Sequence, residues 1–185
     1  MIHIPILRQG RPYKSLETYK LYDKKTSEPI CEVSMANRGL IAKDLSLYSE
    51  NVQKFNGISI SESLQICKAA AEFYANGDLP IGDHIQSGEE YIKCLSMTSG
   101  LPETLCESNM KKIQLALDKM DSVLAGMTRS NDLSFLDNNN QHKDNPNINF
   151  ICEADSLGVV APNNSPGVHT LWLPAIPLKV ALCIR

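Results

Sequence analysis

The 185-residue sequence lacks an apolar run as long as a membrane span. Its first residues, MIHIPILRQGRPY, lack the charged region and small-residue cleavage site of a secretion signal. It also lacks a basic block, since 18 Lys and Arg against 21 Asp and Glu leave a formal charge of -3. These absences argue against a membrane protein and against an electrostatic surface for nucleic acid. We therefore expect a cytoplasmic protein that binds neither membranes nor nucleic acid.

Metal-binding and phosphate-binding motifs are missing as well. No C-x-x-C pair occurs, no histidine stands near a cysteine at metal-ligand spacing, and no Gly-rich phosphate loop or nucleophile motif is present. We expect no metal site, and we interpret most cysteines as small buried hydrophobic residues. The six cysteines are Cys31, Cys67, Cys94, Cys106, Cys152 and Cys183.

The overall composition, 43% hydrophobic and 21% charged, is typical of a globular protein, and the sequence pattern favours the α/β class. Four segments follow from the pattern: an N-terminal extended or hairpin segment (1–37), a helical region (38–135), a polar loop (136–149) and the start of a sheet (150–185). In the first segment ETYKLY and ICEVSM flank DKKTSEP, which predicts a hairpin. Alternation of Cys31 and Val33 with Glu32 and Ser34 predicts a strand with one buried face.

The helical region carries its own start and stop signals. Ser59 and Glu62 have capping-box spacing ahead of SLQICKAAAEFYA, and the following Asn-Gly step predicts an end. A second helix is expected in GEEYIKCLSM, and the longest after Pro102. Its apolar positions recur every three or four residues, which fits a coiled-coil seam or a core face; core packing is favoured because the stripe spans only about three heptads. The stripe comprises Cys106, Met110, Ile113, Leu117, Met120, Leu124 and Met127.

After the polar loop, LGVVAPNNSPGVHTLWL predicts a buried strand through Val160, a polar turn and a helix, which is the repeating unit of an α/β sheet. Ser165 is expected to cap the helix and Pro166 to open it. Asn164 would then lie at the carboxyl edge of a parallel strand, where its amide could donate to a developing oxyanion. The alternative is that Asn163 and Asn164 are turn residues only, and the local pattern favours this alternative.

The segment LGVVAPNNSPGVHTLWLPAIPLKVALCIR resembles the part of the aldehyde dehydrogenase superfamily that runs GVVGVIxPWNFP, a helix with a Trp and a Pro-Ala step, and then VVVKP. TSEPICEV is similar to the family's TGEPIAEV hairpin, so the resemblance extends over most of the chain. It is closest to a bacterial subgroup of aldehyde dehydrogenase or acyl-CoA reductase-like proteins with LPNNSPGVHSLWLPAI. The resemblance implies the first strands of an incomplete Rossmann-like dinucleotide-binding domain.

The resemblance also implies roles for particular residues. Asn164 takes the place of the family's oxyanion-binding Asn. The positions implied to lie along NAD or NADP are Val160, Ala161, Pro162, Asn163 and Arg185. Those implied to face the aldehyde are Ser165, His169 and Trp172, although His169 and Trp172 could equally be core residues. Asn163 replaces the family's Trp and Arg185 its Lys, which puts the pocket shape and the ribose contact in question because a guanidinium and an ammonium are not interchangeable.

The implied function is NAD(P)-dependent oxidation of an aldehyde, or reduction of an acyl thioester, through a cysteine thiohemiacetal in a homo-oligomeric full-length enzyme. None of the six cysteines has the family's Gly-Gln-x-Cys context, and the family's glutamate base is not recognised. We therefore expect an N-terminal fragment that is inactive alone. The alternative is a non-catalytic interaction module that pairs its extended segment INFICEA with the sheet edge of a partner.

Overall fold

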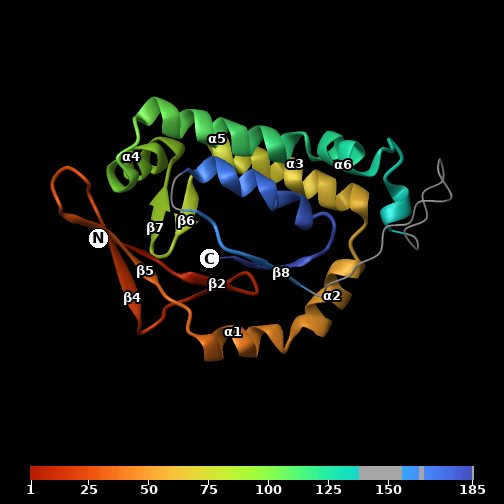
Figure 1. The fold of residues 1–185 in the computed structure, drawn as a ribbon, viewed down its shortest axis with the longest axis horizontal. Coiled ribbons are helices and arrows are strands. Elements are labelled where there is room, and N and C mark those ends of the chain that lie inside the picture. The colour runs from red at the N-terminus through yellow and green to blue at the C-terminus, as the bar shows by residue number, and fades with distance from the viewer. Residues whose placement is uncertain (138–155, 163–164, 185) are drawn as a thin grey trace. The chain divides into compact units, whose positions relative to one another are not determined.

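The computed structural model describes residues 1–137, 156–162 and 165–184, and it shows a mixed α/β protein (Figure 1). The chain divides into two compact units. The first comprises Met1–Leu47 and Phe73–Lys111, and the second comprises Tyr48–Glu72 and Lys112–Arg185. No helix of the described part is long and apolar enough to cross a membrane.

The first unit is built on a three-stranded sheet with the order β1-β5-β4. Strands β4 (Thr18–Tyr22) and β5 (Pro29–Ser34) form an antiparallel hairpin, which confirms the hairpin predicted from the sequence. The sequence pattern did not predict β1 (Ile2–Ile4), which pairs in parallel with the other edge of β5. Asp23 organises the hairpin turn, because its carboxylate accepts the backbone N–H of Lys25 at 2.6 Å.

Strand β5 departs from the expected alternation at one position. Cys31 is buried as predicted, but Ser34, expected on the polar face, is only 6% exposed. Its hydroxyl lies 3.0 Å from Nε2 of His3 and accepts the backbone N–H of Ser15 at 3.0 Å. The prediction for Ser34 is wrong because hydrogen bonds from distant residues satisfy the hydroxyl and remove the usual cost of burying it.

Two short hairpins complete the strands of the first unit. Strands β2 (Ile6–Arg8) and β3 (Arg11–Tyr13) are joined by Gln9 and Gly10, which both have positive φ. Strands β6 (Leu79–Ile81) and β7 (His84–Gln86) are joined by a turn that begins at Gly82, with φ 62°. Each strand has only three residues, too few for a period of two to be visible in the sequence, and β6 and β7 lie inside the stretch expected to be helical.

Two helices belong wholly to the first unit. Helix α1 (Arg38–Leu45) begins after Asn37, whose side chain accepts the N–H of Leu40. Helix α4 (Gly88–Ser99) coincides with the helix predicted in GEEYIKCLSM and starts with a complete capping box between Ser87 and Glu90. The backbone N–H of Lys24 donates to the carbonyl of Met97 at 2.9 Å, which ties the β4–β5 turn to this helix.

Helices α3 (Ile60–Asn76) and α5 (Glu103–Asp118) each contribute to both units. The predicted cap of α3 is confirmed, since Oγ of Ser59 accepts the N–H of Glu62 at 3.1 Å. The single long helix expected after Pro102 is two helices, because α5 ends at Asp118 and α6 (Met120–Thr128) begins after Lys119. Six of the seven stripe residues are buried, which confirms the core interpretation, and Met127 is the exception at 56% exposed.

The second unit also contains α2 (Tyr48–Asn56), the short 3₁₀ helix η1 (Ser134–Leu136) and two parallel strands, β8 (Ser156–Val159) and β9 (Ala181–Ile184). Helix α2 contacts β9, and α6 contacts the short helix η3 (Leu173–Ala175). The buried side chains Met120 and Leu124 of α6 and Leu173 of η3 contribute to the apolar core of this unit.

Gly82 is the glycine for which replacement has the clearest expected cost. A Cβ at this position would lie 2.1 Å from the carbonyl oxygen of His3, and φ is positive. Gly82→Ala is therefore expected to lower the free energy of unfolding by at least about 2 kcal/mol, from backbone strain and the clash with β1. Urea unfolding followed by circular dichroism measures the change.

Gly10 provides a matched control because its φ is 76° and no atom lies within 4 Å of the place that a Cβ would occupy. Gly10→Ala should lower the free energy of unfolding by only about 1 kcal/mol, the cost of placing a side chain at positive φ. Equal losses for the two variants would contradict a close approach of the β6–β7 turn to β1.

Candidate functional site

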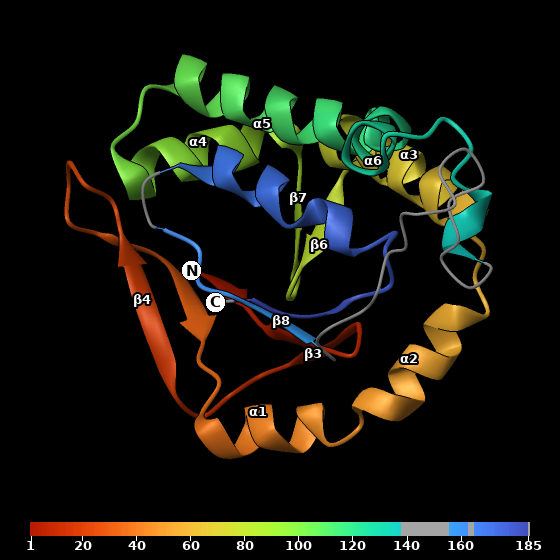
Figure 2. The same ribbon diagram turned by 45° about the vertical axis from the view of Figure 1, so that its right-hand side comes forward.

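The parallel pair β8–β9 and the connection between its strands contain the residues for which the sequence predicted a function. Ser156 pairs with Ala181 and Val159 with Ile184, so the carboxyl ends of both strands lie together. Parallel strands cannot be joined by a tight turn, and the described residues 160–162 and 165–180 belong to the crossover, whose helical part is coloured blue in Figure 2. A strand, a helical crossover and a parallel strand are the arrangement predicted from the sequence.

The crossover begins at the predicted cap. Ser165 has extended backbone angles and its hydroxyl accepts the N–H of Gly167 at 3.4 Å, with Pro166 at the first helical position. The predicted helix that follows, η2 (Pro166–Leu171), is a 3₁₀ helix. Pro174 explains why a continuous α-helix does not extend through this segment. Its nitrogen carries no hydrogen to donate to the carbonyl four residues earlier, and its ring would clash with that carbonyl.

His169 and Trp172 lie one turn apart and contact each other. The indole N–H of Trp172 donates to Nδ1 of His169 at 3.1 Å, and the rings meet edge to face with centroids 5.8 Å apart. Because Nδ1 accepts this hydrogen bond, the neutral imidazole carries its proton on Nε2. In this arrangement His169 can donate a hydrogen bond from Nε2 but offers no free basic nitrogen. Both side chains lie in the described crossover, and His169 is half-buried.

The crossover ends in a Schellman-type turn. The N–H of Lys179 donates to the carbonyl of Ile176, and the N–H of Val180 donates to the carbonyl of Ala175, both at 3.0 Å. Lys179 has φ 61°, the left-handed position that glycine usually occupies. Its ammonium lies 2.9 Å from Oδ1 of Asp137, with the Lys179 side chain only 14% exposed. The ion pair offsets part of the backbone strain at Lys179.

Asp137 joins the crossover to helix α3. Its two carboxylate oxygens accept the backbone N–H of Ile60, the first residue of the helix, at 2.9 and 3.0 Å. A carboxylate at this end of a helix satisfies a donor that has no partner within the helix and interacts favourably with the helix dipole. Sequence analysis missed Asp137 and Lys179, because the bonded residues are 77 and 42 positions apart and no local motif marks them.

Strand β8 is shorter and more exposed than the buried strand through Val160 that the sequence predicts. Strand β8 ends at Val159, and Val160 is 84% exposed; Leu157 within the strand is 41% exposed. In the described part of the chain β8 pairs with β9 alone, so neighbouring strands do not cover it as a central strand would be covered. Ala161 is half-buried and Pro162 is exposed. The three candidate cofactor-binding residues therefore form an accessible, apolar end to β8.

Several residues predicted to act at the site lie outside the described residues. They are the proposed oxyanion donor Asn164, together with Asn163 and Arg185. Most of the polar loop and the segment INFICEA, including Cys152, also fall outside. Their roles stay predictions.

Four of the five described cysteines are poorly suited to nucleophilic attack. Burial raises the pKa of the thiols of Cys31, Cys67, Cys94 and Cys106 above the ordinary value of 9.0. A thiolate is the reactive form, so each of these thiols is less reactive at neutral pH than a free cysteine. Within the described residues no cluster of three His, Cys, Asp or Glu could hold a metal ion.

Comparison with known proteins does not assign the chain to a family. No protein-family model and no curated protein matches the chain. The similarity to aldehyde dehydrogenases thus depends on the motif in residues 157–185 and on the TSEPICEV hairpin, and it stays a prediction.

Asp137→Ala tests the anchor of the crossover. Removing the carboxylate leaves the N–H of Ile60 without its acceptor and the Lys179 ammonium without its counter-charge. We expect the free energy of unfolding to fall by about 2 kcal/mol, the range of hydrogen bonds to charged groups. Chemical denaturation gives the value.

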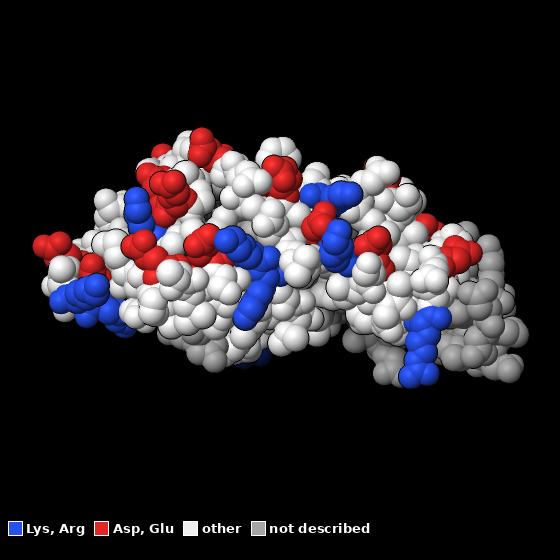
Figure 3. Space-filling view, turned by 90° about the horizontal axis from the view of Figure 1, so that it is seen from above, with Lys and Arg blue, Asp and Glu red and all other residues white. Residues whose placement is uncertain are grey.

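The exposed pair Glu107–Lys111 is the control. Its nitrogen and oxygen are 2.6 Å apart on α5, but the side chains are 49% and 69% exposed, and charges of both signs are interspersed on the face shown in Figure 3. Lys111→Ala should lower the free energy of unfolding by no more than about 0.5 kcal/mol. A loss at Asp137 as small as that at Lys111 would mean that the Asp137 contacts do not anchor the crossover.

Alkylation by iodoacetamide tests the thiol environment. Since the raised pKa keeps these thiols protonated, we expect Cys31, Cys67, Cys94 and Cys106 to react more slowly than free cysteine at pH 8. Their rates should continue to rise at pH values where free cysteine has reached its plateau. Mass spectrometry of tryptic peptides gives the rate for each residue. Fast, pH-independent labelling of any of the four would show an activated thiol.

Proposed function

We propose that residues 156–184 are part of a dinucleotide-binding element of an aldehyde dehydrogenase-like oxidoreductase that takes NAD or NADP. The observation that carries the proposal is the parallel register of β8 and β9 across a helical crossover. In open α/β sheets ligands bind outside the carboxyl ends of the strands, next to the start of the following helix. In this chain that edge is formed by Val159, Ile184 and the residues that follow β8.

The described residues at this edge fit a flat, partly apolar ligand. Val160 is 84% exposed, Pro162 is exposed, and a Cβ at Gly158 would meet nothing within 4 Å. Val160, Ala161 and Pro162 carry no charge that would repel the phosphates of a dinucleotide. When bound, the nicotinamide would accept or donate a hydride. Under the proposal, Asn163 and Arg185 complete the cofactor contacts.

The remaining roles concern the substrate, an aldehyde or an acyl thioester. Asn164 would donate its amide hydrogen to the carbonyl oxygen as negative charge develops there, which stabilises the transition state more than the ground state. The Nε2–H of His169 would be a second donor, held in orientation by the hydrogen bond from Trp172. The hydroxyl of Ser165 accepts the Gly167 N–H, so its first role is to position the start of η2.

The chemistry further requires a thiolate to attack the carbonyl carbon. Cys31, Cys67, Cys94 and Cys106 do not suit this step because burial raises the pKa of each thiol. Cys152 and Cys183 lack the Gly-Gln-x-Cys context of the family's nucleophile, so we expect the 185-residue chain alone to bind the dinucleotide without oxidising aldehydes.

Trp172 is the single tryptophan of the chain and lies in the crossover, so its fluorescence reports on this site directly. Titration with NAD and separately with NADP, with correction for nucleotide absorbance, should give a saturable change in Trp172 emission. Val160→Glu should weaken the binding at least about tenfold, because the added carboxylate repels the phosphates and replaces an apolar contact. Isothermal calorimetry provides an independent binding constant.

Leu115→Glu is the matched control, since Leu115 is also an exposed apolar residue, at 60%, on helix α5. It should bind the nucleotide as the wild type does. A folded chain that shows no saturable response to either nucleotide, or one in which Val160→Glu and Leu115→Glu behave alike, would contradict the proposal.

A further inference from the structure

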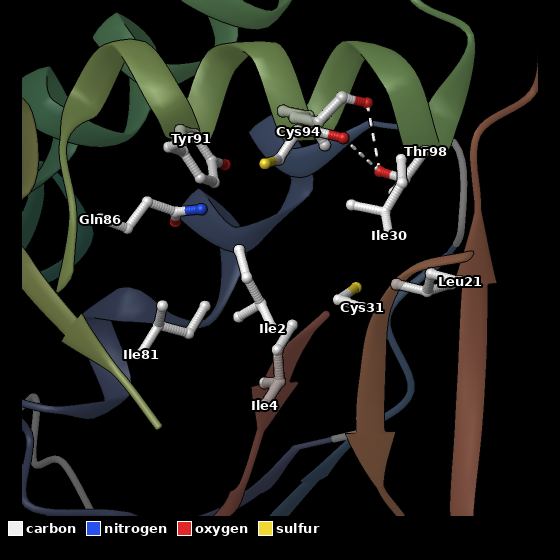
Figure 4. Close-up of a pocket in the computed structure, with 11 residues that line it drawn as sticks. Ile2, Ile4, Leu21, Ile30, Cys31, Ile81, Gln86, Tyr91, Cys94 and Thr98 are labelled. Atoms are coloured by element: carbon white, nitrogen blue, oxygen red, sulfur yellow. Dashed lines mark hydrogen bonds between the residues drawn. The ribbon is translucent and has the colours of Figure 1, made fainter. Parts of the chain in front are cut away.

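The first unit contains an apolar cavity that no step of the proposed function uses. It has a volume of about 140 Å³ and lies among β1, the β4–β5 hairpin, the β6–β7 hairpin and helix α4 (Figure 4). Isoleucines from three of these strands line it, at positions 2, 4, 30 and 81. The thiols of Cys31 on β5 and Cys94 on α4 also line the cavity.

Two of the three polar side chains in the cavity wall, Thr98 and Tyr91, have hydrogen-bond partners in the protein. The hydroxyl of Thr98 donates to the carbonyl of Cys94 at 2.8 Å, and the hydroxyls of Tyr91 and Tyr74 are bonded at 3.3 Å. The third is the amide of Gln86, and most of the wall is apolar. A buried water needs two to four polar partners, and a single amide in an otherwise apolar wall offers water little stabilisation. The cavity therefore favours an apolar occupant over water.

We propose that this cavity binds one small apolar molecule of about the size of a benzene ring. An apolar cavity of about 150 Å³ in another protein accepts benzene, and the volume here is similar. The two sulfur atoms add polarisable contacts that favour an aromatic ring. Every lining residue except Cys31 is half-buried, so the cavity can be reached from solvent. The site lies within the first unit and is independent of the proposed dinucleotide site.

Benzene titration of the full chain, followed by NMR of ¹³C-labelled isoleucine methyl groups, tests the proposal. We expect saturable shifts at Ile2, Ile4, Ile30 and Ile81. The buried isoleucines Ile60 and Ile113 belong to the second unit, so their signals should not move. Absence of saturable shifts at the lining isoleucines, or equal shifts at Ile60 and Ile113, would overturn the proposal.

A pair of substitutions at one position separates filling of the cavity from loss of the thiol. Cys94→Leu adds volume at the wall and should abolish saturable benzene binding, whereas Cys94→Ala removes volume and should retain it. The dispersion of the methyl spectrum shows whether each variant is folded. A folded Cys94→Leu variant that binds benzene as the wild type does would refute the proposed site, and the wild-type titration decides the question if that variant does not fold.

Discussion

The carboxylate of Asp137 is the contact on which the arrangement of the candidate site depends. It accepts the first N–H of helix α3 and pairs with the ammonium of Lys179 at the end of the crossover. Lys179 holds a left-handed backbone conformation, which is unfavourable for a side chain with a Cβ and stable only where neighbouring contacts enforce it. One half-buried carboxylate thus fixes the start of a helix and the turn that returns the chain into β9. That turn leads directly into β9, which pairs in parallel with β8.

The chemistry available at this site is determined by what its side chains already contact. Nδ1 of His169 accepts the indole N–H of Trp172, so the ring can donate but cannot serve as a base through that nitrogen. The hydroxyl of Ser165 caps η2. These contacts favour binding and orientation over proton abstraction. The accessible apolar residues after β8 suit a ligand at the strand ends, as in other parallel sheets.

Local signals predicted the parts of the fold that are stabilised locally. The helix that starts at the Ser87 and Glu90 capping box, the cap at Ser59 and the hairpin of β4 and β5 were predicted because each depends on residues a few positions apart. The strands of three residues were missed, since they are too short for a periodic pattern. Ser34 was assigned to the wrong face because its partners, His3 and Ser15, lie 31 and 19 residues away. Predictions at Asn163, Asn164 and Arg185 concern residues that the structure does not describe.

The sequence by itself determined the mixed α/β class, the apolar stripe of α5 and α6, and the cap at Ser165, because helix periodicity and capping act within a few residues. Only the tertiary structure decided that the helix carrying the stripe is interrupted at Lys119, that Asp137 holds Lys179, and that Cys31 and Cys94 line one cavity. Each of these features joins groups from separate elements or depends on how an element packs. Hydrophobic burial specifies which residues go inside but not which of them meet, so such pairings arise only when the whole chain is packed.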